Sequence, residues 1–227
     1  MQARFVLSGL LVLWALCPAR VAAQGYLCGK SAPPVITVNV VTGPVTFDTK
    51  QSADALRHIE IDTVSPWPET YHTAVGGIMQ GRISADHKIT FNRAKDVKRG
   101  SACVWFERID VTLRADPKIY IANDLQDKTC WFREVFAHEA KHVAEDHALL
   151  ERYKQRVKDG LYMVFSTHAD YASGPVPLVG LKATQGQMKE NVTQALNAMF
   201  AMMARERAQR QQSLDNLGEY IKISRGC

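Results

Sequence analysis

The chain has 227 residues and a formal net charge of +5, and 46% of its residues are hydrophobic. This length and composition suit one globular domain with a sizeable core. The basic residues are scattered, apart from a local cluster at 205–210, and such a run is usually a solvated helix face. The charge balance therefore gives no reason to expect a nucleic-acid partner.

Residues 1–23 have the pattern of a secretory signal peptide. Arg4 supplies the positive start, the apolar run from Phe5 to Cys17 is too short to span a bilayer, and small residues at 21–23 form a cleavage site. Cleavage would leave residues 24–227 as a single secreted or periplasmic domain without a stable membrane anchor. No feature of the sequence indicates an oligomeric state.

Four cysteines follow the predicted signal peptide: Cys28, Cys103, Cys130 and Cys227. An even number in an exported chain predicts two disulfides and an oxidising compartment. Zinc ligation is not favoured, because no two cysteines have CxxC spacing. Of the three possible pairings we expect Cys103–Cys130, which would tie the last strands to the following helix, and Cys28–Cys227, which would join the termini.

The first half of the domain is predicted to be antiparallel β-structure. Short runs rich in β-branched residues alternate with turn signals, such as Gly76-Gly77, Asp86-His87 and Asp116-Pro117. Residues 52–56 favour one or two turns of helix. The expected strands are 35–41, 45–47, 58–62, 71–75, 78–83, 88–91, 104–113 and 118–121.

The second half is predicted to be helical. One helix should cover residues 131–158, with a cap at Asp127 or Thr129 and an end at Asp159-Gly160. A loop with two prolines at 174–179 precedes a long helix from about 184 to at least 212. Strands followed by helices, with no linker between them, predict a single domain of the α+β class.

The first of these helices carries the motif HExxH, from His138 to His142. Helical residues four apart lie about one turn above each other, so both imidazoles can reach one ion. Imidazole nitrogen binds Zn²⁺, and catalytic zinc sites keep one position open for water. Glu139 projects about 100° around the helix from His138, from where it can act as a general base on that water. The motif therefore predicts a zinc site for metal-assisted hydrolysis.

Two histidines do not complete a zinc site, so a third ligand is needed. Glu206 falls on the apolar stripe of the last helix, where a carboxylate is costly unless it is paired or metal-bound. We expect it to be the third ligand, and the alternative is an ion pair with Arg210, four residues on. His147, His168 and Asp170 are the other candidate ligands. His147 lies about 140° around an unbroken helix from His142, so it would need a kink.

These features resemble the zincin metallopeptidases of the gluzincin kind, and more closely small secreted bacterial proteins regarded as zinc-dependent peptidases of unassigned function. The close resemblance covers roughly residues 118–150. Beyond that range the resemblance is limited to the order of the secondary-structure elements. It is carried by the strand Ile119 to Ala122, by Cys130 ahead of Phe136-Ala-His-Glu139, and by the helix with Glu206 before Cys227.

The resemblance implies a zinc peptidase acting on a peptide or protein substrate. His138, His142 and Glu206 would bind zinc, and Glu139 would activate water. Arg210 stands where the gluzincin ExxxD pattern has its aspartate. The sequence around Glu206 therefore departs from the pattern that implies its role as a ligand.

Lys141 also departs from the zincin pattern, because both residues between the glutamate and the second histidine are normally uncharged. This charge, with the imperfect downstream pattern, supports a second interpretation: a non-catalytic periplasmic binding or assembly module that keeps a zinc site. A third is a different hydrolase with the same metal site, such as an amidase acting on cell-wall peptide. Nothing in the sequence specifies the substrate or the cleavage preference.

Overall fold

The computed structural model describes residue 28 and residues 32–61, 63–67, 74–167 and 172–227. The predicted signal peptide lies outside the described residues. Within them, no helix has both the length and the apolar character needed to cross a membrane.

The sheet is built around β4 (Ser101–Ile121). The strand β3 (Gly77–Asp96) pairs with it antiparallel along its whole length. The other edge of β4 is shared by three shorter strands, β5 (Val176–Pro177), β1 (Val35–Thr42) and β2 (Thr46–Asp48), of which β1 and β2 run parallel to β4. The α+β class is confirmed, and the sheet is mixed, whereas we expected only antiparallel pairs.

Strands β3 and β4 form a hairpin that is longer than the sequence suggested. The turn signals at Asp86-His87 and Asp116-Pro117 both lie inside continuous strands. Pro117 is tolerated because β1 ends opposite Ala115 and β2 begins opposite Lys118, so the missing N–H falls between two ladders. A strand of this length spans about 70 Å, since each residue adds about 3.3 Å.

In two other predicted strands, 58–62 and 71–75, the residues that the structure describes do not form strands, and residue 62 lies outside them. Residues 58–61 form turns and irregular backbone after the short helix α1 (Ala53–Leu56). Of the expected strand at 71–75, residues 74 and 75 are irregular and residues 71–73 lie outside the described residues. The described residues between α1 and β3 therefore form a connection, and Thr63 and Val64 in it lie close to the candidate site.

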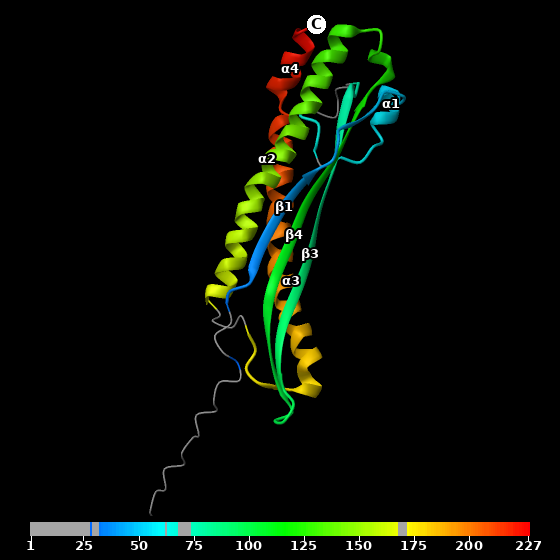
Figure 1. Ribbon diagram of the computed structural model, residues 1–227. Helices are drawn as coiled ribbons and strands as arrows, with labels where there is room; N and C mark the ends of the chain where they lie inside the picture. The colour runs from blue at the N-terminus through cyan, green and yellow to red at the C-terminus, as the bar shows by residue number, and fades with distance from the viewer. Residues whose placement is uncertain (1–27, 29–31, 62, 68–73, 168–171) are drawn as a thin grey trace, which may run out of the picture.

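Two long helices run side by side along one face of the sheet (Figure 1). The first, α2 (Thr129–Thr167), continues for seven residues beyond Gly160, where we expected it to end, and the second is α3 (Leu181–Leu214). A Cβ at position 160 would lie only 2.6 Å from Met199 Sδ, so this glycine permits the close approach of α2 to α3. The remaining elements are η1 (Asn123–Leu125), η2 (Leu178–Gly180) and α4 (Leu217–Arg225).

The core lies between this helical layer and the sheet. Along β4, Ile109, Val111 and Leu113 are fully buried and alternate with Asp110 and Thr112 on the open face. The helices contribute apolar side chains to the same cluster. The two-residue alternation that predicted a strand with one wet face is therefore confirmed.

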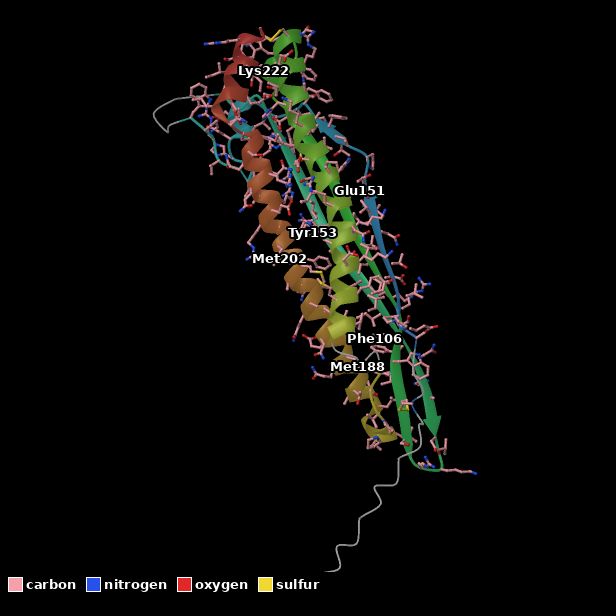
Figure 2. All side chains as sticks on the ribbon, turned by 90° about the vertical axis from the view of Figure 1, so that its left-hand side faces the viewer. Phe106, Glu151, Tyr153, Met188, Met202 and Lys222 are labelled. Carbon is pink, nitrogen blue, oxygen red and sulfur yellow. A yellow bond between two sulfur atoms is a disulfide. The ribbon has the colours of Figure 1, made fainter. Side chains whose placement is uncertain are left out.

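The disulfides are Cys28–Cys103 and Cys130–Cys227 (Figure 2). Both pairings differ from the expected ones. Cys103 lies at the hairpin end of β4, whereas Cys130 lies beyond the opposite end of the strand, at the start of α2. The expected pairing assumed short separate strands, which would have brought these residues together. The two disulfides do indicate an oxidising compartment.

Candidate metal centre

The two histidines of HExxH project from one side of α2 toward a common point. His138 and His142 are 4% and 5% exposed, and their Nε2 atoms lie 3.2 Å apart. Their rings meet edge to face, with centroids 4.9 Å apart. The helical spacing thus brings two imidazole nitrogens together in a buried position, as the sequence predicted.

A third donor comes from Asp215, in the short break between α3 and α4. Its Oδ1 lies 3.0 Å from His138 Nε2 and 3.3 Å from His142 Nε2. Three ligands of a tetrahedral zinc, each at about 2.0–2.1 Å from the ion, are about 3.3 Å apart. The triangle formed by these three atoms therefore has the size that a tetrahedral ion requires.

Glu206 is not a member of this group, so the structure does not support it as the third ligand. Its Oε1 accepts a hydrogen bond from Arg210 Nε at 2.8 Å, and its Oε2 accepts from Tyr153 and Arg156. Burial alone would raise the pKa of Glu206, but these hydrogen bonds outweigh it and lower the pKa. The ion pair with Arg210, which the sequence offered as the alternative, is the observed arrangement.

The other candidate ligands do not join the group either. His147 lies one turn further along α2 and is absent from it, in keeping with its predicted direction on an unbroken helix. His168 and Asp170 lie outside the described residues. Within the described part of the chain, the group comprises only His138, His142 and Asp215.

Hydrogen bonds fix which nitrogen of His142 carries its proton. Gln211 Nε2 donates to Asp146 Oδ1 at 2.6 Å and to the carbonyl of His142 at 3.1 Å, which sets the orientation of the amide. Its Oε1 then accepts from His142 Nδ1. In the neutral ring, Nε2 consequently presents its lone pair to the group. Asp146 is held in turn by Arg207, whose Nε lies 2.8 Å from Oδ1.

The outer nitrogen of His138 faces a second carboxylate. Among the described residues its Nδ1 has no hydrogen-bond partner, and Glu219 Oε1 lies 4.0 Å away. Glu219 also forms an ion pair with Lys141, which lowers the pKa of the carboxyl group. Lys141, the residue that departs from the zincin pattern, therefore turns away from the ligand group and orders the carboxylate behind His138.

Glu139 lies against the first residues of β3. A Cβ at position 77 would be 3.1 Å from its Oε1, so Gly77 allows the strand to pass close to the carboxylate. The backbone N–H of Met79 hydrogen-bonds the same side chain. Burial raises the pKa of Glu139 to about 7, although both histidines oppose this shift. A carboxyl group with this pKa can both accept and donate a proton near neutral pH.

Tyr220 brings a hydroxyl group to the same centre from α4. Its Oη donates to Asp215 Oδ1 at 3.2 Å, and its ring meets that of His138 at a centroid distance of 5.5 Å. Burial raises the pKa of Tyr220, and the charges of Asp215 and Glu139 raise it further. The phenol therefore stays a neutral hydrogen-bond donor over the physiological range.

The connection between α1 and β3 covers one side of Asp215. Thr63 donates a hydrogen bond to this carboxylate. The next residue, Val64, is held by Gln212, whose amide accepts from its N–H at 2.8 Å and donates to its carbonyl at 3.1 Å. Burial would raise the pKa of Asp215, but its contacts with His138, His142 and Thr63 lower it. Asp215 is therefore charged at neutral pH.

Asp215 is the site residue that sequence reasoning missed. We looked for the third ligand on the apolar stripe of the last helix, whereas Asp215 follows the last residue of α3, Leu214. Asn216, which caps α4 through its side chain, marks the break between the two helices. The pair Asp215-Asn216 was a visible signal for a helix end, but nothing in it indicated proximity to His138.

No protein-family model, no curated protein and no solved structure matches this chain. Evidence for function therefore comes from the fold and from the geometry of this centre.

Proposed function

We propose that the chain is a secreted or periplasmic zinc-dependent peptidase of the zincin type. The observation that carries this proposal is the triangle of His138 Nε2, His142 Nε2 and Asp215 Oδ1, with edges of 3.0–3.3 Å and Glu139 beside it. The HExxH motif supplies two of these ligands and the base. The predicted signal peptide and the two disulfides support export.

Two imidazole nitrogens and one carboxylate oxygen are a donor set typical of catalytic zinc sites. The residues fit the ion in burial and in the orientation of their lone pairs, since Gln211 holds the proton of His142 on Nδ1. Zinc bound there would supply Lewis acidity, which polarises a carbonyl group and makes a water molecule more acidic.

The other steps belong to the side chains of the protein. Glu139 accepts a proton from the attacking water and delivers it to the nitrogen of the leaving amine. Tyr220 is placed to donate a hydrogen bond to the negative charge that develops on the substrate oxygen.

The decisive experiment compares the purified wild-type protein with Glu139→Gln and Asp215→Ala. We expect one zinc per chain in the wild type and in Glu139→Gln, and loss of zinc from Asp215→Ala. Cleavage of a peptide library should be detected only with the wild type. Removal of a general base typically lowers the rate about 10²- to 10⁴-fold. Wild-type protein that binds no zinc would overturn the proposal.

The burial of the centre favours a second candidate, a module that binds zinc without catalysis. His138, Glu139, His142 and Asp215 are all at most 7% exposed, and the connection at Thr63 lies against Asp215. A structural zinc site normally has four protein ligands. Wild-type protein that holds one zinc but cleaves nothing in broad peptide libraries would establish this candidate and exclude the peptidase.

A further inference from the structure

At the end of the molecule opposite α4, two segments form one surface (Figure 1). They are residues 93–100, at the tip of the β3–β4 hairpin, and residues 175–182, which lead into α3. The N–H of Leu178 donates to the carbonyl of Gly100 at 2.9 Å, and Pro177 pairs with Ser101 in the sheet. These bonds hold the segments side by side, and we refer to them together as the hairpin end.

The hairpin end carries more positive charge than the rest of the domain. Its single acidic residue is Asp96, which lies 3.7 Å from the nearest nitrogen of Arg99, so the net charge of the two segments is +4. Residues 24–227 together carry +3, because Arg4 and Arg20 contribute two of the five charges of the whole chain. The remainder of the domain is thus slightly negative. The exposed cations are Arg93, Lys95, Lys98, Arg99 and Lys182.

The same surface presents the two most exposed large hydrophobic side chains of the described residues. Val179 is 96% exposed and Val97 is 77% exposed. Each lies in a segment whose backbone is held by the bonds described above, and Gly100, with a φ of 61°, closes the turn after Val97. Both side chains therefore bury little apolar area against the rest of the described residues.

We propose that the hairpin end binds reversibly to the surface of an anionic lipid bilayer. The cations would approach the headgroup phosphates, and Val97 and Val179 would enter the interfacial region between the headgroups and the acyl chains. The charge of the surface selects an anionic partner. The two valines select a bilayer over a soluble polyanion, because only a bilayer offers apolar volume behind its charges.

This contact would place the metal centre far from the bilayer. Strand β3 begins beside Glu139 at Gly77 and ends at the hairpin tip, and its 20 residues span about 65 Å. A protein attached by the hairpin end would therefore present its centre to substrates well away from the lipid surface. The inference is independent of the proposed peptidase activity, since it concerns binding alone.

The test is co-sedimentation of the disulfide-bonded protein with vesicles of phosphatidylcholine, with and without phosphatidylglycerol. We expect binding only to the anionic vesicles, with a loss at high salt. The double variant Lys98→Glu/Arg99→Glu should bind at least about thirtyfold more weakly, because each cation near such a surface contributes about fivefold. The matched control Arg82→Glu/Lys88→Glu makes the same charge change on the open face of the sheet and should bind like the wild type.

A second pair of variants separates a bilayer from a soluble polyanion. Val97→Ser/Val179→Ser should lower vesicle binding about threefold to tenfold, since the apolar contribution is lost. It should leave binding to dextran sulfate unchanged. Wild-type protein that does not bind anionic vesicles at low salt would overturn the proposal. Equal vesicle binding by the serine variant and the wild type would overturn it too, and would indicate a site for soluble polyanions.

Discussion

Two carboxylates between the C-terminal helices and α2 meet different partners. Asp215 lies among imidazole nitrogens and is 7% exposed, whereas Glu206 lies among the guanidinium groups of Arg156 and Arg210 on the outer side of the helical layer. Tyr153, which donates to Glu206, is labelled there in Figure 2. An imidazole has a lone pair to share with an ion, but a guanidinium group has none. The comparison shows that the partner of an acid decides its role.

The supporting residues of the two carboxylates differ in the same way. Behind the ligand group, Gln211 is 2% exposed and makes three hydrogen bonds, to two acceptors and from one donor. Around Glu206, the side chains of Arg152, Arg210 and Arg156 are 32%, 41% and 55% exposed. The first arrangement is rigid and suited to binding an ion, while the second is screened by solvent.

The difference between the two carboxylates is tested most directly by removing each of them separately. Asp215→Ala deletes one of the three proposed ligands. Changes behind the ligands typically lower metal affinity 10- to 100-fold, so we expect zinc affinity here to fall by more than about a hundredfold. Glu206→Ala should leave zinc affinity unchanged. Both affinities can be measured by competition with a chromophoric chelator. If Glu206→Ala releases zinc and Asp215→Ala does not, the ligand assignment is wrong.

The next effect concerns Glu139 in the metal-free protein. Because burial raises its pKa from 4.5 to about 7, the folded chain holds a proton that the unfolded chain releases at lower pH. The unfolding free energy should therefore fall as the pH rises from about 4.5 to 7, by about 3 kcal/mol in total. Glu139→Gln carries no such proton. In urea unfolding with excess chelator, the variant should gain stability over the wild type as the pH rises, and parallel pH profiles would contradict the predicted pKa.

Local patterns predicted the parts of the site that lie within one helix. HExxH placed His138, Glu139 and His142 correctly relative to one another, because helical geometry fixes residues one and four apart. Asp215 comes 73 residues after His142 and approaches it only because α3 packs back along α2. The apolar stripe on the last helix predicts that this helix packs against another element. It does not predict which of its residues comes close to His142.

The long strands explain most of the other differences. Turn-forming pairs such as Asp116-Pro117 have a strong local preference, but cross-strand pairing over 20 residues of β3 outweighed it. The wrong strand lengths also led to the wrong disulfide pairing. Once β4 is a single strand, Cys103 and Cys130 lie toward opposite ends of the molecule, and each pairs with the cysteine nearest to its own end.

A smaller effect is expected from the residue behind His142. Gln211→Ala removes the acceptor that holds the proton on Nδ1, so the ring loses its fixed orientation. We expect zinc affinity to fall about 10- to 100-fold, less than for Asp215→Ala. The matched change behind the other histidine is Glu219→Gln, which keeps an oxygen near His138 Nδ1 and should have the weaker effect of the two. Equal affinities for Gln211→Ala and the wild type would show that the amide does not orient the ring.

The smallest effect is expected at Glu206, whose side chain is 20% exposed. Glu206→Gln removes the charge that pairs with Arg156 and Arg210 but keeps the shape of the side chain. Ion pairs with partners this exposed contribute at most about 1 kcal/mol, because solvent screens them. Urea unfolding should therefore give a change in unfolding free energy within that limit, and added salt should reduce it further. A loss of several kcal/mol would show that Glu206 is as tightly held as Asp215, and the contrast between the two carboxylates would then lie only in their partners.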